Sequence, residues 1–177
     1  RIWRVVPTGA GPTPPVSLAT ASNRELLQSL QSPNAWRRQT GQRVLIERGD
    51  RSVVAALIAI LRDRDNPFAQ ARLHALRTLE GLGALRAAYL RGALGDPHYG
   101  VRVHALQLSE ALLATEPELL ARVLRLTDDP DPRARLELAM TLGGSPDPAA
   151  TTALLKLAVE HGHERWMASA ILSASRD

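Results

Sequence analysis

Apolar residues recur at helical spacing over most of this chain. In residues 51–62 they fall at Val53, Val54, Leu57, Ile58 and Leu61, which places them on one face of an α-helix. Residues 68–81 carry a second apolar face, built mainly from alanine and leucine. Because a short polar turn separates the two segments, we expect the two helices to pack against each other as a pair.

Five such helix pairs are predicted along the chain. Their expected bounds are 22–31 with 35–48, 51–62 with 68–81, 84–94 with 99–114, 116–126 with 133–142, and 149–160 with 165–173. Ser22 and Glu25 have the spacing of a capping box at the start of the first helix, and Thr115 and Glu118 repeat that spacing. Glycines 81 and 83 mark the end of a helix.

The N-terminal segment 1–20 has a different pattern. Residues 1–6 alternate apolar and polar side chains, as a short strand does, and residues 7–15 are rich in proline and glycine, as in an extended linker. We therefore divide the chain into a strand and linker over 1–20 and a helical repeat domain over 21–177.

A fixed period links the helix pairs. Four dipeptides of a helix-capping residue and proline, each followed by an arginine, open the second helices. They are Ser32-Pro33, Asn66-Pro67, Asp96-Pro97 and Asp131-Pro132, followed by Arg38, Arg72, Arg102 and Arg135. The numbers of these arginines rise in nearly equal steps, and the steps fall within the ~20 to ~50 residues typical of solenoid repeats. The chain is predicted to be all-α, an α-solenoid of about five helix pairs with a short N-terminal extended segment.

The turn and the second helix of each pair resemble those of HEAT repeats. The resemblance is carried by a turn aspartate followed by alanine or valine and then arginine, as in Ala71-Arg72, Val101-Arg102 and Ala134-Arg135. It implies a structural ladder between successive repeats. The ladder residues that it implies are Asp65, Asp96 and Asp131 with Arg72, Arg102 and Arg135. The spacing is shorter than the ~40 to ~47 residues usual for HEAT repeats, and Trp166 takes the place of arginine in the last pair.

A second resemblance covers the segment 1–50. The stretches RIWRVVPTG (1–9) and PPVSLATASNRELLQSLQSPNAWRRQTGQRVLIERGD (14–50) are similar to the junction between a propeller of the membrane-bound or glucose/sorbosone dehydrogenase type and a HEAT-like segment in large bacterial proteins. That resemblance implies a longer parent protein, periplasmic or secreted, which carries a c-type haem domain elsewhere. The haem is attached there through Cys-x-x-Cys-His, and this chain has no cysteine.

Composition excludes several kinds of site and leaves the choice of partner open. Without cysteine there is no disulfide, no thiolate metal ligand and no cysteine nucleophile. The longest apolar run, 53–61, is too short for the ~20 residues of a membrane-spanning helix. Residues 1–102 contain 15 arginines and 7 acidic residues, whereas 103–177 contain 7 basic and 11 acidic residues. The basic half favours an anionic partner such as nucleic acid, and an ordinary solvated surface explains it equally well.

No motif predicts a cofactor, a metal or catalysis. His161 and His163, next to Glu164, supply two or three potential ligands in a predicted loop, but zinc needs three or four that converge tetrahedrally; a solvated turn is favoured. The segment that begins at Asp63 lacks the glycine and the glutamate of a calcium loop. We expect no metal, no cofactor and no enzyme activity in this segment.

The predicted function is that of an interaction or scaffold module, because stacked repeats present long surfaces. The expected partner is a protein or an adjacent domain of the same chain, and membrane insertion is not expected. The residues predicted to bind the partner are Arg37, Arg43, His74, Arg77, His104 and Gln107. The alternative is a nucleic-acid-binding protein, similar to HEAT-like DNA glycosylases, with Trp36 and Trp166 in its groove.

Overall fold

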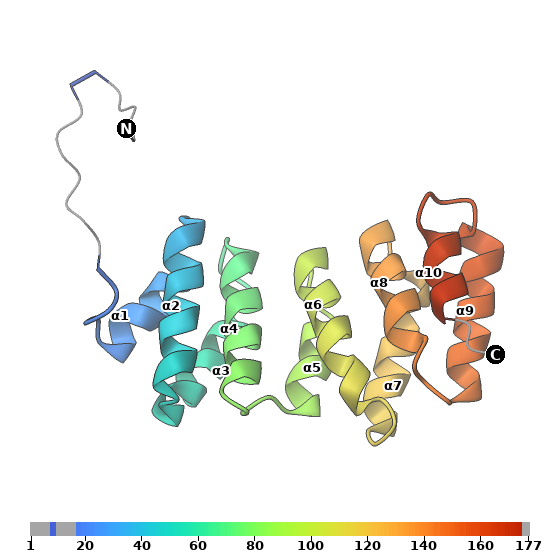
Figure 1. The fold of residues 1–177 in the computed structure, drawn as a ribbon, viewed down its shortest axis with the longest axis horizontal. Helices are drawn as coiled ribbons and strands as arrows, with labels where there is room; N and C mark the ends of the chain where they lie inside the picture. Colours follow the sequence, from blue (N-terminus) through green and yellow to red (C-terminus); the bar gives the residue numbers. More distant parts are fainter. Residues whose placement is uncertain (1–7, 10–16, 175–177) are drawn as a thin grey trace.

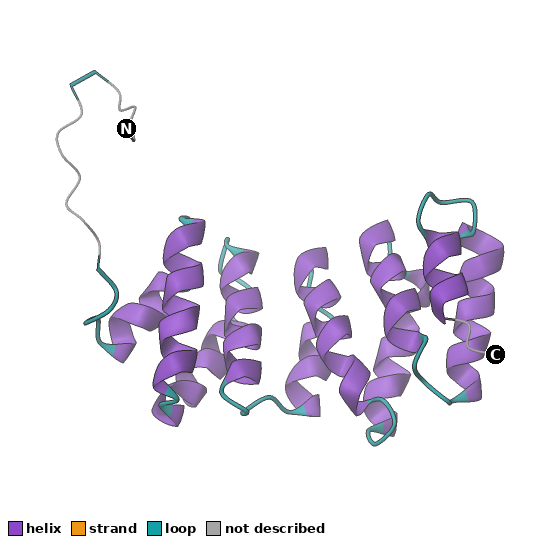
Figure 2. Cartoon of the chain, viewed as in Figure 1, coloured by secondary structure: helices purple, strands orange, loops and turns teal. Residues whose placement is uncertain are grey.

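The computed structural model describes residues 8–9 and 17–174, and within them the regular structure is entirely helical (Figure 2). The predicted strand over 1–6, and the linker over 7–15 apart from the turn at Thr8 and Gly9, lie outside the described residues.

Ten α-helices in the described part form five pairs that stack in chain order (Figure 1). The pairs are α1 (Asn23–Ser29) with α2 (Ala35–Arg48), α3 (Val54–Arg62) with α4 (Ala69–Gly81), α5 (Ala87–Ala93) with α6 (Tyr99–Ser109), α7 (Pro117–Leu124) with α8 (Pro132–Leu142), and α9 (Pro148–His161) with α10 (Met167–Ala174). Short 3-10 segments extend three helix ends, at Arg51–Val53, Glu110–Leu112 and Arg125–Asp128. The predicted α-solenoid of five pairs is confirmed.

The second helices α2, α4, α6, α8 and α10 pack against one another in sequence and form one layer of the stack. Their N-terminal ends all lie along the upper edge of the molecule in Figure 1. Each helix buries one apolar face in the core. In α4 this face is formed by Ala71, Ala75, Leu76 and Leu79, which have no exposed surface. The spacing of the apolar residues along the sequence therefore predicts which face of each helix is buried.

Side-chain caps begin α1, α2, α6, α8 and α9, whereas α3, α4, α5 and α7 begin without one. The predicted capping box at α1 is present: the Ser22 hydroxyl accepts from the Glu25 backbone N–H at 3.3 Å, and the Glu25 carboxylate accepts from the Ser22 backbone N–H at 2.7 Å. The box expected at Thr115 is wrong. Pro117 occupies the first helical position of α7 and makes Glu116 the N-cap residue, so that Thr115 instead donates its hydroxyl to Leu112 O at 3.3 Å.

A small residue sets the distance between α1 and α2. A Cβ atom built on Gly41 would lie 1.8 Å from Ser29 Oγ and 3.2 Å from Leu26 O. Ser29 is buried in this contact and donates its hydroxyl to Leu26 O at 2.6 Å. The backbone of α2 therefore lies close against α1, and a larger residue at position 41 would require Ser29 to move.

Arginines join each repeat from the second onward to the next. Arg72 donates to Asp96 through two bonds, Nε to Oδ2 at 2.8 Å and Nη2 to Oδ1 at 3.0 Å, and both side chains are almost fully buried. Arg102 binds Asp129 in the same two-pronged way, at 2.7 and 2.6 Å. Each arginine also donates to a carbonyl of the turn before its own helix, as Arg102 does to Asp96 O at 2.8 Å. One guanidinium thereby ties two successive turns together.

The acidic partners are not all those expected from the HEAT resemblance. Asp129 takes the place of Asp131, and Glu164 binds Arg135 at 2.6 Å. Asp96 and Asp129 are equivalent because the side chain of each binds the arginine of the preceding second helix, and the backbone carbonyl of each accepts from the arginine of the following one at 2.8 Å. Asp131 instead caps α8, accepting from Arg133 N at 2.9 Å. Asp65 is exposed, and its backbone N–H donates to the Asp63 side chain at 3.2 Å.

Candidate partner-binding surface

Four of the six residues predicted to bind a partner lie together on the layer of second helices. Arg77 of α4 donates from Nε to His104 Nδ1 of α6 at 2.8 Å and also hydrogen-bonds Gln107. Gln107 in turn donates to Glu137 of α8 at 2.9 Å. A polar row therefore crosses three helices, each of which contributes a side chain that holds its neighbour.

His74 continues this row toward the N-terminus. Its Nδ1 lies 2.6 Å from Gln42 Oε1 of α2, so the row spans α2, α4, α6 and α8. We name the row formed by Gln42, His74, Arg77, His104, Gln107 and Glu137 the polar row. Sequence reasoning missed Gln42 and Glu137. The signal for Glu137 is its position in the repeat, since it follows Arg135 in α8 as His104 follows Arg102 in α6.

The other two predicted residues lie outside the polar row. Arg43 is exposed and lies 3.8 Å from Glu47, one turn along α2. Arg37 is exposed in the first turn of α2, and its backbone N–H is used to cap that helix by donating to Asn34 Oδ1 at 3.3 Å.

Burial shifts the pKa values of the titratable side chains within the polar row. It lowers the pKa of His74 from 6.5 to about 4, with further lowering from the Arg38 and His104 charges. Burial also lowers the pKa of His104, and the neighbouring Arg77 adds to this. Both imidazoles are therefore neutral at pH 7, as the bond from Arg77 to His104 Nδ1 requires. Burial raises the pKa of the Glu137 carboxyl against the opposing effect of its bond from Gln107.

A second feature runs along the N-terminal ends of the second helices. Sequence reasoning brought together only two of its residues, Trp36 and Trp166, as groove residues of the nucleic-acid-binding alternative. Large aromatic side chains lie there, at or near the start of four of the five helices, and many are exposed: Trp36 by 53%, Phe68 by 40% and Trp166 by 58%. We name Trp36, Phe68, His98, Tyr99, Arg133 and Trp166 the aromatic edge. The signal in the sequence is that Trp36, Phe68 and Tyr99 each follow closely after a capping dipeptide.

The C-terminal part of the aromatic edge is held in place by stacking. The rings of His98 and Tyr99 stack with centroids 4.9 Å apart, and the Arg133 guanidinium lies 3.4 Å from the Tyr99 centroid. Asp131 binds Arg133 at 2.8 Å. The Arg165 guanidinium lies 4.8 Å from the Trp166 ring. The contact of Arg133 with Tyr99 joins the ends of α6 and α8.

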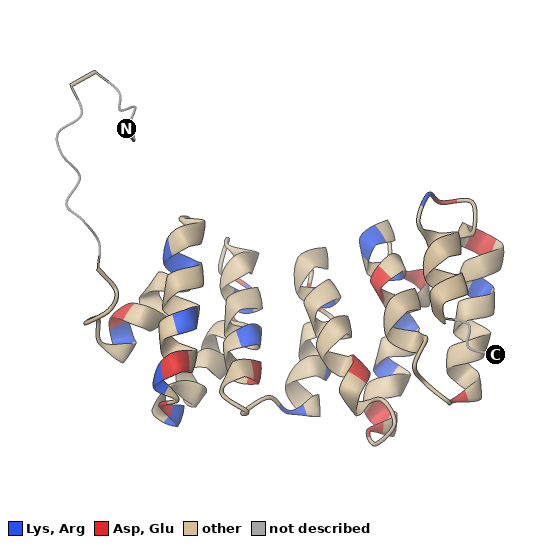
Figure 3. Cartoon of the chain, in the orientation of Figure 1, with Lys and Arg blue, Asp and Glu red and all other residues tan. Residues whose placement is uncertain are grey.

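Charges are distributed unevenly over the stack. Figure 3 shows basic positions on α2 and α4 and at the upper ends of α2 and α8, and acidic positions at the lower ends of α2, α4 and α6 and in the C-terminal pairs. Many of these charges are paired within the chain: Arg64 with Asp96, Arg91 with Glu118 at 3.3 Å, and Lys156 with Asp128 at 2.5 Å. The surface is therefore a mosaic and not a continuous basic track.

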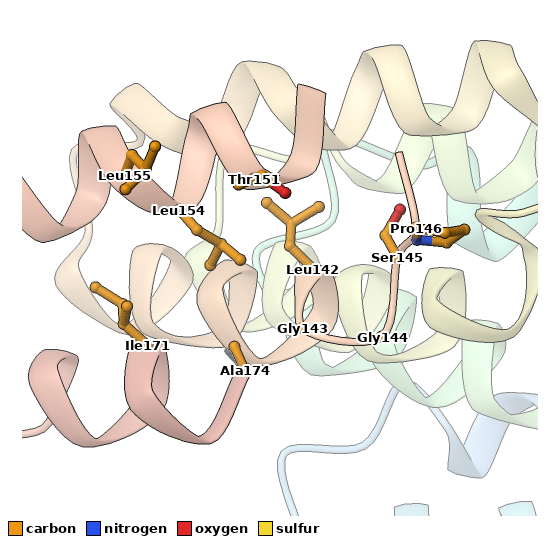
Figure 4. A pocket seen from close by; sticks show the side chains of 10 residues that line it. All are labelled: Leu142, Gly143, Gly144, Ser145, Pro146, Thr151, Leu154, Leu155, Ile171 and Ala174. Carbon is orange, nitrogen blue, oxygen red and sulfur yellow. The ribbon is translucent and has the colours of Figure 1, made fainter. Parts of the chain in front are cut away.

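A groove of about 390 Å³ opens at the C-terminal end of the stack (Figure 4). Leucines and alanines of α8, α9 and α10 line it together with the loop 143–146, and its side-chain hydroxyls come from Ser145 and Thr151. No acidic, basic or thiol side chain is among its lining residues.

The histidine segment after α9 forms a local contact. His161 Nδ1 lies 3.0 Å from Glu164 Oε1, the same carboxylate oxygen that binds Arg135. Within the described residues, no three histidine or acidic side chains are placed to hold a metal ion.

The comparisons with known proteins agree with this architecture. A comparison with protein families matches residues 87–175, half of the chain, to HEAT repeats. A search of curated proteins found no match. Among the described helices, none has the length and apolar character needed to cross a membrane. With its five stacked helix pairs and this match, the chain belongs to the HEAT repeat family.

Proposed function

We propose that this chain is a non-catalytic interaction module that binds a protein partner, or a neighbouring domain of a larger bacterial protein, through the aromatic edge and the adjoining polar row. The observation that carries the proposal is the exposure of Trp36, Phe68 and Trp166 at one end of the second helices. Large aromatic side chains rarely stay exposed in a series, and tryptophan, tyrosine and arginine dominate the energy of protein interfaces.

Rigidity of the surface supports the proposal. Buried arginines tie α4 to the turn before α6 and α6 to the turn before α8, and the bonds of the polar row link α2, α4, α6 and α8. A partner therefore meets side chains whose positions are already fixed, and it loses little free energy in ordering them. HEAT repeats, like other solenoids, present extended surfaces of this kind.

The charge pattern favours a protein over nucleic acid as the partner. Binding to a phosphate backbone depends on arginines and lysines that are free to neutralise phosphates. Arg77, Arg133 and Arg43 are already engaged by side chains of this chain. The arginine-rich N-terminal half supports the alternative, a nucleic-acid-binding protein similar to DNA glycosylases. It predicts duplex DNA binding at low salt that weakens steeply as salt rises, and no binding at low salt would exclude it.

The larger protein that we propose is a dehydrogenase-like electron-transfer protein, periplasmic or secreted, with a c-type haem domain. This rests on the resemblance of the segment 1–50 to a propeller junction. An antibody against this chain, used on a blot of the source cells with a stain for covalent haem, tests it. A haem-positive band much larger than 19.2 kDa supports this context, and a haem-free band near that mass refutes it.

The interaction itself is tested by affinity capture of partners with three tagged proteins: the unaltered chain, the triple variant W36A/F68A/W166A, and the control A55Q/A88Q/A121Q. The control positions are exposed on α3, α5 and α7, one on each of these helices. The proposal predicts that the partner found with the unaltered chain is retained by the control and lost by the aromatic variant. Retention by the aromatic variant would refute the role of the edge.

A further inference from the structure

Arg38 of α2 has the position of a ladder arginine but lacks a carboxylate partner. Its Nη1 donates to Ser32 O at 2.7 Å and to Pro33 O at 2.8 Å, in the turn before α2. Arg102 Nη1 binds two carbonyls of the turn before α6 in the same way. The other two donor atoms of Arg102, Nε and Nη2, bind Asp129. In Arg38 these two atoms have no acceptor within the described part of the chain, and we name them the open fork.

Asn66 is the reason for the missing ion pair. Its backbone carbonyl accepts from Arg72 at 3.2 Å, as the Asp96 carbonyl accepts from Arg102, so the two residues hold equivalent positions in successive turns. The Asp96 side chain has a second oxygen, which accepts from Arg72 Nε at 2.8 Å. Asn66 has an amide nitrogen in its place, which can only donate and is bonded to Gln31 Oε1 at 3.1 Å. The exchange of one oxygen for nitrogen leaves the first junction without its ion pair.

The charge of Arg38 is therefore uncompensated at a partly buried position. Its Nε is buried with no acceptor, whereas its Nη2 is open to solvent. Burial first, and then the charge of Arg38, lower the pKa of His74 on α4 to about 4. A desolvated donor without an acceptor costs free energy. A carboxylate that reaches the open fork from outside the chain would recover that cost.

We infer that the open fork binds a carboxylate of the protein partner, from an aspartate or glutamate side chain. This inference rests on the proposed function. The chain itself indicates the class of ligand, because the three arginines equivalent to Arg38 each bind one carboxylate through Nη2. They are Arg72 with Asp96, Arg102 with Asp129, and Arg135 with Glu164. A planar carboxylate also matches the geometry of a guanidinium fork.

Arg38 lies close to the residues that we propose as anchors for the partner. It follows Trp36 in the first turn of α2, and its guanidinium lies on the turn before that helix. The bond from Asn66 to Gln31 holds the neighbouring turn, which leads to Phe68, against the first helix pair. A partner that covers Trp36 and Phe68 therefore comes near the open fork, and an acidic residue between its apolar anchors would meet the charge of Arg38.

Acetate is the probe for the open fork, because it carries the inferred group and nothing else that binds. The Nε–H signals of the arginines are followed by ¹⁵N NMR during titration with sodium acetate, with sodium chloride at equal ionic strength as the reference. The Arg38 signal is expected to shift and saturate with acetate, whereas the signals of Arg72 and Arg102, whose forks are occupied, stay in place. An Arg38 signal that responds no more than that of Arg72 would overturn the inference. So would a response to dimethyl phosphate without one to acetate, which the nucleic-acid alternative predicts.

The substitution N66D supplies the missing carboxylate from within the chain. It is expected to raise the midpoint of thermal unfolding by ~2 to ~8 °C and to abolish the response of the Arg38 signal to acetate. The matched control Q70E makes the same change of charge at an exposed position in the first turn of α4, and it should alter neither. An undiminished response to acetate in N66D would contradict the assignment of the open fork.

The same two variants test the link to the partner. N66D is expected to weaken binding of the protein captured by the unaltered chain ~10-fold or more, as expected for loss of a charged hydrogen bond, and Q70E should bind it normally. If N66D binds it with full affinity while W36A/F68A/W166A does not, the inference fails and the proposed function stands. If W36A/F68A/W166A retains the partner and N66D loses it, the role of the aromatic edge fails and the open fork stands.

Discussion

Arg72 of α4 and Asp96, in the turn before α6, form a two-pronged ion pair that is almost completely removed from water. The same aspartate also accepts the backbone N–H of His98 at 2.9 Å and binds Arg64. One carboxylate thus joins α4, the turn before it and the start of α6. Its removal would leave a buried guanidinium without its charge partner.

We therefore expect D96A to lower the free energy of unfolding by ~3 to ~5 kcal/mol, the usual cost of removing one member of a buried ion pair. D65A is the matched control, since Asp65 is exposed and outside the ladder; it should change stability by less than ~0.5 kcal/mol. Urea unfolding followed by circular dichroism measures both. Equal effects of the two substitutions would contradict the position of Asp96 in the ladder.

In the next ion pair of the ladder, two neighbouring aspartates have different roles. Asp129 is buried and bonded to Arg102 at 2.6 and 2.7 Å, whereas Asp131 caps α8. We predict that D129A costs ~3 kcal/mol or more and that D131A costs only the ~0.5 to ~2 kcal/mol of a lost N-cap. Urea unfolding followed by circular dichroism measures the loss of stability in both variants. If D131A proves the more damaging substitution, Asp131 is the ladder residue and the assignment to Asp129 is wrong.

Stability should depend on pH through His74. Because burial lowers its folded-state pKa to about 4, the unfolded chain binds more protons than the folded chain between pH 4 and 6.5, so stability rises with pH over that range. Between pH 7 and pH 4 the unaltered chain should lose ~1 to ~3 kcal/mol more than H74Q, which has no titrating group at this position. Parallel pH profiles of the two proteins would show that His74 is not buried in its neutral form.

Two glycine-to-alanine substitutions should change the stability of the fold in opposite directions. G41A places a methyl group against Ser29 and the Leu26 carbonyl, which forces α1 and α2 apart and should cost ~1 to ~3 kcal/mol. G92A, in α5, meets no atom within 4 Å of its Cβ and should stabilise by ~0.5 to ~1 kcal/mol through the higher helix propensity of alanine. Thermal unfolding of both variants gives the signs; a neutral G41A would mean that the two helices are not in close contact.

The helix pairs could be predicted from the sequence because local and long-range signals agree in each repeat. The apolar period of α3 and α4, the capping box at Ser22 and the proline at the start of α8 all describe the same helices that the structure contains. The box at Thr115 failed because Pro117, which has no backbone N–H to cap, shifted the start of α7 by one residue.

The ladder could be predicted only in part. Its arginines occupy a fixed position in each second helix, which the period reveals. Their partners lie in turns, where Asp129-Pro130 and Asp131-Pro132 carry the same local signal. The depth of each carboxylate in the stack, which decides between them, is a property of the tertiary structure.

Apart from Trp36 and Trp166, which the nucleic-acid-binding alternative placed in one groove, the aromatic edge was not predicted, for a related reason. Trp36, Phe68 and Trp166 do not share one position in the repeat, so the period does not align them. They come together because all five second helices begin along the same edge of the stack (Figure 1). Only the arrangement of the helix ends in space shows them as a series.

The central claim, that a protein partner binds along the aromatic edge, is tested most directly by site-specific photo-crosslinking in the cells that make the protein. A photoreactive phenylalanine is placed at Phe68 on the edge or at Ala88 on α5, which is exposed on a first helix of the stack. The account predicts that a defined protein adduct forms from position 68 and is absent or much weaker from position 88. An adduct that forms equally from both positions, or only from position 88, would contradict it.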